Sequence, residues 1–235
     1  SPSPTPTPAS TPSPTPTPSP TPTWACGQPI TDSRDNKEYD TILIGSQCWM
    51  AENLNYGTKT NGANDQGSNC PSIAETEKYC YNNNEANCTS DGALYQWNQA
   101  MCGSASCNGT GAPPNDRCST PVRGICPIGW HIPSHYEWTT LERAVCTSPT
   151  CASDFPYDTT TTGQRGTDEG IRLKVGGSSG FEVLMTGIRS TDGSFDYRGE
   201  NTYIWCSLQN STNAWRRSLS KNSTTILRNY NSKSF

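Results

Sequence analysis

Histidine, charge and aliphatic side chains are all scarce in this 235-residue sequence. Two residues are histidine, 16% are charged and 31% are hydrophobic. Only His131 and His135 could supply the histidine of a Ser-His-Asp triad, so the sequence does not suggest such a triad. Their i, i+4 spacing is that of some zinc helices, but Pro133 lies between them and interrupts the segment. We therefore expect no enzyme activity, no bound metal and no cofactor.

Long apolar runs and dense basic runs are also missing. No stretch approaches the roughly 20 apolar residues of a transmembrane helix, and no cluster of Lys and Arg predicts nucleic-acid binding. Charge is nevertheless uneven: residues 196–235 contain six basic and two acidic side chains, whereas the whole chain has a net charge of −4. A basic end on an acidic body can attract anionic partners, although a solvated face is the simpler interpretation.

Proline dominates the start of the chain. Residues 1–23 contain ten Pro, seven Thr, five Ser and one Ala, a composition that favours polyproline II and cannot build a core. At about 3.1 Å per residue this segment reaches roughly 70 Å. It is predicted to be a stalk, either O-glycosylated or unmodified, ahead of a domain over residues 24–235. We expect an export signal and a membrane anchor upstream, and therefore an extracellular position on a bacterial cell surface.

Cysteine is abundant, and every cysteine lies outside the stalk. The twelve are Cys26, Cys48, Cys70, Cys80, Cys88, Cys102, Cys107, Cys118, Cys126, Cys146, Cys151 and Cys206. This usage predicts a disulfide framework and an oxidising compartment, because a domain so poor in aliphatics needs covalent support. Zinc binding is the alternative, but the surrounding loops are rich in Gly, Ser and Asn and few histidines are available.

Short loops suggest some of the disulfide pairs. We expect the bonds Cys26–Cys48, Cys80–Cys88, Cys102–Cys107 and Cys146–Cys151. The bonds Cys70–Cys118 and Cys126–Cys206 are what then remains.

Hydrophobic patterns predict an α+β domain with two helices and short antiparallel strands. Residues 39–44 and 47–50 form a hairpin around the turn Gly45-Ser46, and a polar loop follows over 55–78. Residues 93–101 form a first helix, with Leu94, Trp97 and Met101 on one face.

The second half of the chain is predicted in the same way. A second helix begins at the capping box Ser134-His135-Tyr136-Glu137 and buries Trp138, Leu141 and Val145. Loops are expected over 102–124 and 147–170. The later strand candidates are residues 181–188, 202–208, 214–220 and 224–230.

Several ordered motifs together resemble one family, the Fibrobacter succinogenes major paralogous domain. They are GSQCWMAENL (45–54), DGALYQW (91–97), GICPIGWHIPS (124–134), GIR (187–189), GSF (193–195) and YIW (203–205). The resemblance covers roughly residues 26–235. It implies an exported surface domain of C-type-lectin-like fold with no established catalytic activity.

The resemblance also implies features of the C-terminal region. Some members resemble targets of diversity-generating retroelements, whose last strands vary a binding face. Members usually continue past the position of Phe235 into a strand ending in cysteine, so the resemblance implies that the last strand is missing and that its cysteine is the partner of Cys126. Cys206 stands where Ser is usual and is then a spare thiol. The scaffold also resembles formylglycine-generating enzymes, but nothing nearby supplies Cys206 with a catalytic partner.

The C-terminal segment also has the composition of a binding surface. Tyr, Arg and Asn combine contact area with hydrogen bonding, although polar outward positions on antiparallel strands would look alike. Trp205 and Trp215 are expected in the core. A calcium-dependent sugar motif is not found, since Gln28-Pro29-Ile30 lies far from the expected region. The candidate ligand residues are Tyr197, Arg198, Glu200, Asn201, Tyr203, Asn210, Arg216, Asn222, Asn229 and Tyr230.

These observations predict a non-enzymatic display or adhesion module that binds an unknown protein or glycan through its C-terminal strands and loops. The alternative is a structural subunit of a pilin-like surface filament, with the stalk joined to an upstream helix. In that case a neighbouring subunit could complete the open sheet with a donated strand.

Overall fold

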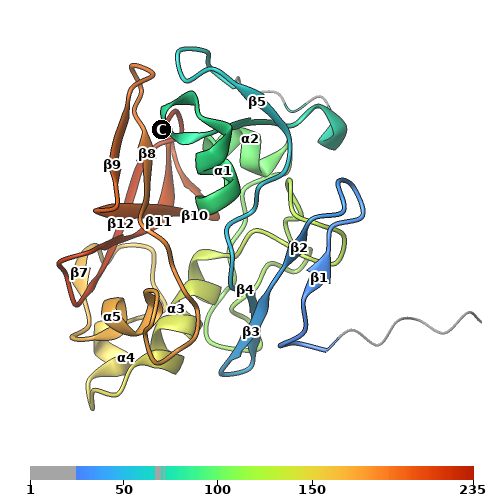
Figure 1. Ribbon diagram of the computed structural model, residues 1–235. Coiled ribbons are helices and arrows are strands. Elements are labelled where there is room, and N and C mark those ends of the chain that lie inside the picture. The colour runs from blue at the N-terminus through green and yellow to red at the C-terminus, as the bar shows by residue number, and fades with distance from the viewer. Residues whose placement is uncertain (1–24, 67–69, 71) are drawn as a thin grey trace, which may run out of the picture.

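A computed structural model describes residues 25–66, 70 and 72–235, so the predicted stalk lies outside the described residues. The described part is an α+β domain (Figure 1). Its helices are η1 (Ile73–Glu75), η2 (Tyr81–Asn83), α1 (Glu85–Asp91), α2 (Trp97–Met101), α3 (His135–Val145), α4 (Cys151–Asp154) and α5 (Glu169–Leu173). Its strands are β1 (Ile30–Thr31), β2 (Glu38–Tyr39), β3 (Thr41–Ile44), β4 (Gln47–Met50), β5 (Thr58–Thr60), β6 (Glu77–Tyr79), β7 (Gly163–Arg165), β8 (Thr186–Arg189), β9 (Phe195–Arg198), β10 (Asn201–Asn210), β11 (Asn213–Ser220) and β12 (Ile226–Ser232).

A four-stranded antiparallel sheet in the order β10–β11–β12–β7 organises the C-terminal half. Because side chains alternate along a strand, each strand divides between two faces. The inner face carries Cys206, Trp215, Leu219 and Ile226, which pack with α3 in the main hydrophobic core. The outer face carries Asn201, Tyr203, Arg216, Ser218 and Asn229.

Helix α3 begins as its sequence predicts. The Ser134 hydroxyl accepts the Glu137 N–H at 3.0 Å, and the Glu137 carboxylate accepts the Ser134 N–H at 2.8 Å. The expected stripe of Trp138, Leu141 and Val145 is buried. Behind it, Glu142 forms a fully buried bidentate pair with Arg217 of β11, at 2.5 and 3.2 Å. The helix is therefore attached to the sheet by charge as well as by apolar packing.

The predicted hairpin of β3 and β4 also forms around Gly45-Ser46. Gly45 has φ +60, which suits the first position of such a turn. Trp49 of β4 packs with ring centroids 5.1 Å from Trp138 and 5.6 Å from Phe181. The hairpin is thereby fixed to the main core.

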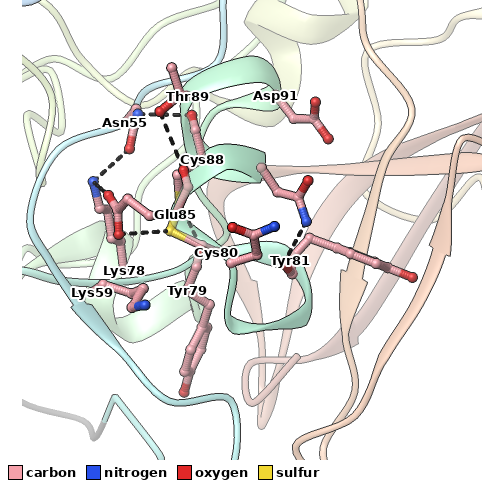
Figure 2. The surroundings of a disulfide bond; sticks show 12 residues. Asn55, Lys59, Lys78, Tyr79, Cys80, Tyr81, Glu85, Cys88, Thr89 and Asp91 are labelled. Carbon is pink, nitrogen blue, oxygen red and sulfur yellow. Dashed lines mark hydrogen bonds and ion pairs between the residues drawn. A yellow bond between two sulfur atoms is a disulfide. The ribbon is translucent and has the colours of Figure 1, made fainter.

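A disulfide organises the segment between β6 and α1 (Figure 2). Cys80 and Cys88 bracket η2 and the first turn of α1. Lys78 donates to the Asn55 side chain at 2.7 Å and lies 3.3 Å from Glu85, and Asn55 in turn donates to the Cys88 carbonyl at 2.8 Å. A buried amine thus links a distant loop to the disulfide.

The structure has more helices than the two predicted. The first predicted helix, over residues 93–101, is shorter in the structure than expected. Residues 93–96 are not helical, because Leu94 exchanges backbone hydrogen bonds of 3.0 Å with Tyr79. Helix α2 therefore begins at Trp97. The expected loop 55–78 contains η1 and the parallel pair β5–β6, and the expected loop 147–170 contains α4, β7 and the start of α5. These elements are too short for periodicity to reveal them.

The strand predicted over residues 181–188 is reduced to β8. Glu182 has φ +56, outside the extended region, and Val183 makes only an isolated bridge with Lys174. The other three strand candidates correspond to β10, β11 and β12, with ends shifted by a few residues. Strand β8 lies beside β10, where the hydroxyls of Thr186 and Thr202 are 3.0 Å apart.

Five disulfides close among the described residues, and three of them confirm predictions: Cys26–Cys48, Cys80–Cys88 and Cys146–Cys151. The predicted bonds Cys102–Cys107 and Cys70–Cys118 are wrong. Cys102 ends α2 in a left-handed conformation and joins Cys70, with Cα atoms 4.6 Å apart. Cys107 donates its N–H to the Ser207 carbonyl of β10 and joins Cys118. Both predictions failed because the fold, and not closeness in sequence, decides which cysteines meet.

The predicted bond Cys126–Cys206 is also wrong, because both thiols are free. Cys206 points into the inner face, where its sulfur lies 3.8 Å from Arg217 Nη1. Cys126 lies in the loop whose Ile125 carbonyl accepts a hydrogen bond from Arg34. The alternative expectation for Cys206, a spare thiol, agrees with this arrangement.

Candidate functional site

The register of the sheet brings four of the ten predicted ligand residues onto the outer face. Tyr203 stands opposite Ser218, Arg216 stands opposite both Trp205 and Asn229, and Asn201 stands opposite Ser220. Directly opposed side chains lie on the same face. The outer face therefore holds a contiguous group of Asn201, Tyr203, Arg216 and Asn229 on a rigid scaffold.

Arg216 is at the centre of this group. Its side chain is 5% exposed, and its guanidinium carbon lies 4.4 Å from the Tyr203 ring centroid and 5.8 Å from that of Phe235. Its Nε donates a long 3.4 Å hydrogen bond to the Asn229 side chain. Burial lowers the pKa of Arg216 to about 10, so the group remains a cation at neutral pH.

Four other predicted residues lie near one end of the sheet, Tyr197 and Arg198 in β9 and Glu200 and Asn222 in turns. Tyr197 is 56% exposed, and Arg198 forms an ion pair with Asp91 at 2.5 Å. The Glu200 carbonyl accepts the Lys221 N–H at 2.7 Å, which brings the turn holding Asn222 beside it. These residues flank the outer face without facing the same way.

The remaining two predicted residues lie at the opposite end of the sheet. Asn210 is exposed at the β10–β11 turn, and Tyr230 projects from the inner face with its ring 5.2 Å from Trp215. Eight residues of β10 separate Asn201 from Asn210, a distance of roughly 30 Å. The ten predicted residues therefore do not form one patch.

The two tryptophans expected in the core behave differently. Trp215 is 2% exposed in the main core. Trp205 is partly buried on the outer face, where its indole donates to the Tyr95 carbonyl at 2.9 Å and its ring packs against a second core around Trp97 and Met101. This second core covers one end of the outer face and leaves the end with Asn201 and Tyr203 open.

Sequence reasoning missed an apolar cleft on another side of the domain. The cleft has a volume of about 1020 Å³, and its lining includes Trp49, Phe181, Val183, Ile204 and the free Cys126. Burial raises the pKa of Cys126, as it does that of Cys206, to about 12. The lining comes from segments far apart in sequence, so no local pattern could have indicated it.

One edge of the cleft is an unpaired strand. In the two-residue hairpin, Gln47 and Trp49 bond to β3, so the main-chain groups of Cys48 and Met50 point away from it. No other described strand pairs with β4. The charged residues of the lining are mainly acidic: Glu38, Asp40, Glu52, Asp91, Glu137 and Glu182 against Lys37 and Arg117.

The two histidines occupy separate environments. His131 Nε2 lies 2.8 Å from Glu137, whereas His135 lies on the inner face with Nδ1 3.1 Å from Arg217 Nη1. Within the described ranges, no three His, Cys, Asp or Glu side chains gather as metal ligands would. None of the described helices has the length and apolar character needed to cross a membrane.

Comparison with known proteins extends the assignment made from the motifs. No curated protein and no solved structure matches the chain. The family model of the Fibrobacter succinogenes major domain matches residues 42–235, which is most of the chain and includes the outer face and nearly all of the cleft lining. The chain therefore belongs to the Fibrobacter succinogenes major domain family.

Proposed function

We propose that the chain is a non-enzymatic extracellular module of C-type-lectin-like fold that binds a ligand on the outer face of its main sheet. The observation that carries this proposal is the gathering of Asn201, Tyr203, Arg216 and Asn229 on that face by the register of β10, β11 and β12. An aromatic ring, amides and a cation held on rigid strands suit recognition, because little side-chain entropy remains to be lost on binding.

The covalent framework supports an exported domain. Five disulfides persist in an oxidising compartment and are rare in a reducing one. The Pro/Thr/Ser composition of residues 1–23 suits a spacer that carries the domain away from the cell surface. Together these features favour display of a binding face to the surroundings.

Binding of wild-type protein to immobilised cell-wall polysaccharides and host extracellular proteins would test the proposal. The double variant Tyr203→Ala/Asn229→Ala removes outer-face contacts, and Lys59→Gln on β5 is a matched surface control. We expect the double variant to lose binding at least tenfold and the control to retain it. Equal binding by all three proteins would show that the outer face is not the site.

The cleft favours a second candidate function, that of a subunit in a surface filament. An apolar groove beside the unpaired edge of β4 suits an extended strand donated by a second copy of the chain. Self-assembly would then complete the sheet.

Sedimentation of two Met50 variants tests this second function. Met50→Pro removes the N–H that points away from β3, and Met50→Ala retains it. We expect concentration-dependent assembly for wild type and Met50→Ala, and monomers for Met50→Pro. Monomeric behaviour of the wild type at every concentration, or a longer chain that fills the cleft with its own strand, would contradict filament assembly.

A further inference from the structure

Lys78 of β6 is the only buried lysine in the described part of the chain, with 4% of its surface exposed. Its Nζ donates to Asn55 Oδ1 at 2.7 Å, whereas the carboxylate oxygen of Glu85 lies 3.3 Å away (Figure 2). Buried charges normally pair most closely with an opposite charge. Here a neutral amide lies closer to the amine than the carboxylate does.

The Asn55 amide is held in place from several sides. Its Nδ2 donates to the Cys88 carbonyl at 2.8 Å, its backbone N–H donates to the Tyr39 hydroxyl at 3.1 Å, and its carbonyl accepts from Lys37 Nζ. A carbonyl bond is about 1.23 Å long, so the 2.7 Å contact with Oδ1 places Lys78 Nζ at most about 3.9 Å from the amide carbon Cγ. Reacting atoms need roughly 3–3.5 Å, which a small rotation of the amide plane supplies.

The surroundings favour the reactive form of the amine. Burial lowers the pKa of Lys78, and the nearby Lys37 ammonium lowers it further. The neutral amine, which is the nucleophile, is therefore more populated than in an exposed lysine. The Glu85 side chain is 57% exposed, so its carboxylate can accept a proton from Nζ and exchange it with solvent.

The three groups come from segments that the fold fixes relative to one another. Strand β6, which carries Lys78, pairs with β5, and the disulfide Cys80–Cys88 joins the end of this strand to the helix that carries Glu85. Such fixed proximity replaces an encounter between separate molecules and lowers the barrier to reaction. Asn55 and Cys88 also line the apolar cleft, which opens a path to solvent for a small leaving group.

We propose that Lys78 and Asn55 form an intramolecular isopeptide bond, with Glu85 as the proton carrier. A bond forms between Nζ and Cγ, the bond between Cγ and Nδ2 breaks, and the departing nitrogen leaves as ammonium. Nζ loses two protons in turn, and Glu85 carries both to Nδ2 and ends as a carboxylate. One amide replaces another, so no oxidant or reductant is needed. This inference goes beyond the proposed function and does not depend on it.

The mass of the intact, reduced and alkylated chain tests the cross-link. We expect a mass lower than that of the sequence by one ammonia. Trypsin should not cleave at the acylated Lys78, so residues 38–59 should remain joined to residues 60–117. A succinimide at Asn61-Gly62 would lose the same mass, but mild base opens a succinimide and leaves the isopeptide bond intact. The full sequence mass, or an ammonia loss mapped to another residue, would overturn the inference.

Substitutions assign the roles of the reacting groups. Lys78→Arg keeps the charge without the nucleophilic amine, and Glu85→Gln keeps the shape without the proton acceptor, so both should have the full sequence mass. Lys59→Arg is the matched control, because Lys59 pairs with Lys78 across β5 and β6 but is exposed and donates to the Asn83 carbonyl at 3.1 Å. It should lose ammonia as the wild type does. Closure of the five disulfides confirms that each variant folds. Ammonia loss in Lys78→Arg would contradict the bond, and unslowed loss in Glu85→Gln would contradict the role of Glu85.

Discussion

Two consecutive arginines of β11 illustrate how one residue type takes opposite roles at the scale of single residues. Arg217 points to the inner face and neutralises Glu142 with both charges fully buried. Arg216 points to the outer face and meets aromatic rings and an amide instead. The alternation of a strand alone separates these environments. Only substitution of Arg217 should therefore lower stability.

Arg217→Met is expected to lower the free energy of unfolding by about 3–5 kcal/mol, because Glu142 would remain buried without its partner. Arg216→Met removes an uncompensated charge and should leave stability unchanged or raise it by about 0.5–2 kcal/mol. Urea denaturation of the two variants measures the difference. A large loss in Arg216→Met would indicate a structural role for that cation.

His135 predicts a dependence of stability on pH. Burial, with Arg217 and Arg228 nearby, holds the pKa of His135 well below its ordinary value. As the pH falls below about 6.5, His135 is therefore protonated in the unfolded chain but remains neutral in the folded chain. Stability should be complete above that pH and fall below it by up to about 1.4 kcal/mol per unit. Thermal melts between pH 7.5 and 5 test this, and His135→Asn should reduce the change of stability with pH. An equal change in the variant would show that other groups cause the pH dependence.

At the scale of elements, helix α3 begins at the capping box that its own sequence predicts. Ser134 caps the first turn and its hydroxyl also contacts the Asp116 carbonyl, at 2.5 Å. Glu137 completes the box from the other side. The capping-box contacts join neighbouring residues, so the sequence alone predicts where this helix begins.

Ser134→Ala should cost about 1–2 kcal/mol of unfolding free energy, because the cap and the contact with Asp116 are both lost. Ser72→Ala provides a control, since Ser72 precedes η1 without capping its backbone; we expect a change within about 0.5 kcal/mol. Chemical denaturation of both variants gives the comparison. Equal effects would mean that the capping geometry does not stabilise α3.

At the scale of the whole molecule, disulfides join segments that no local pattern connects. Cys70–Cys102 spans 32 residues, and Cys107 reaches Cys118 from a backbone position beside β10. Cys126 and Cys206 remain reduced, and burial holds both thiols largely protonated at neutral pH. The framework therefore predicts a definite count of thiols.

Mass spectrometry without reduction should find five closed bonds and two alkylated cysteines after unfolding. In the native protein, alkylation of the buried Cys206 should be slow, since burial and protonation disfavour the reactive thiolate. Peptide mapping identifies the labelled residues as Cys126 and Cys206. Six closed bonds, or rapid native labelling of Cys206, would contradict this arrangement.

Much of the candidate site depends on contacts between residues far apart in sequence, which the sequence alone does not predict. Composition indicated Tyr203, Arg216 and Asn229 as candidate ligand residues, but the pairing of β10, β11 and β12 decided that they share a face. The same pairing placed Tyr230 on the opposite face. The cleft had no local signal, because Trp49, Phe181 and Ile204 meet only after folding.

Local chemistry by itself determined the β3–β4 turn, the cap of α3, the three confirmed disulfides and membership of the family. The turn, the cap and two of the disulfides depend on residues at most eight positions apart, Cys26–Cys48 closes a loop with a sequence separation of 22, and the family depends on ordered motifs. The tertiary structure alone decided the long-range cysteine pairs, the short helices and the isolation of Arg216 from every described carboxylate. The physical reason is that burial and pairing of charges are properties of packed surfaces, and strand register, which sets those surfaces, is a non-local choice.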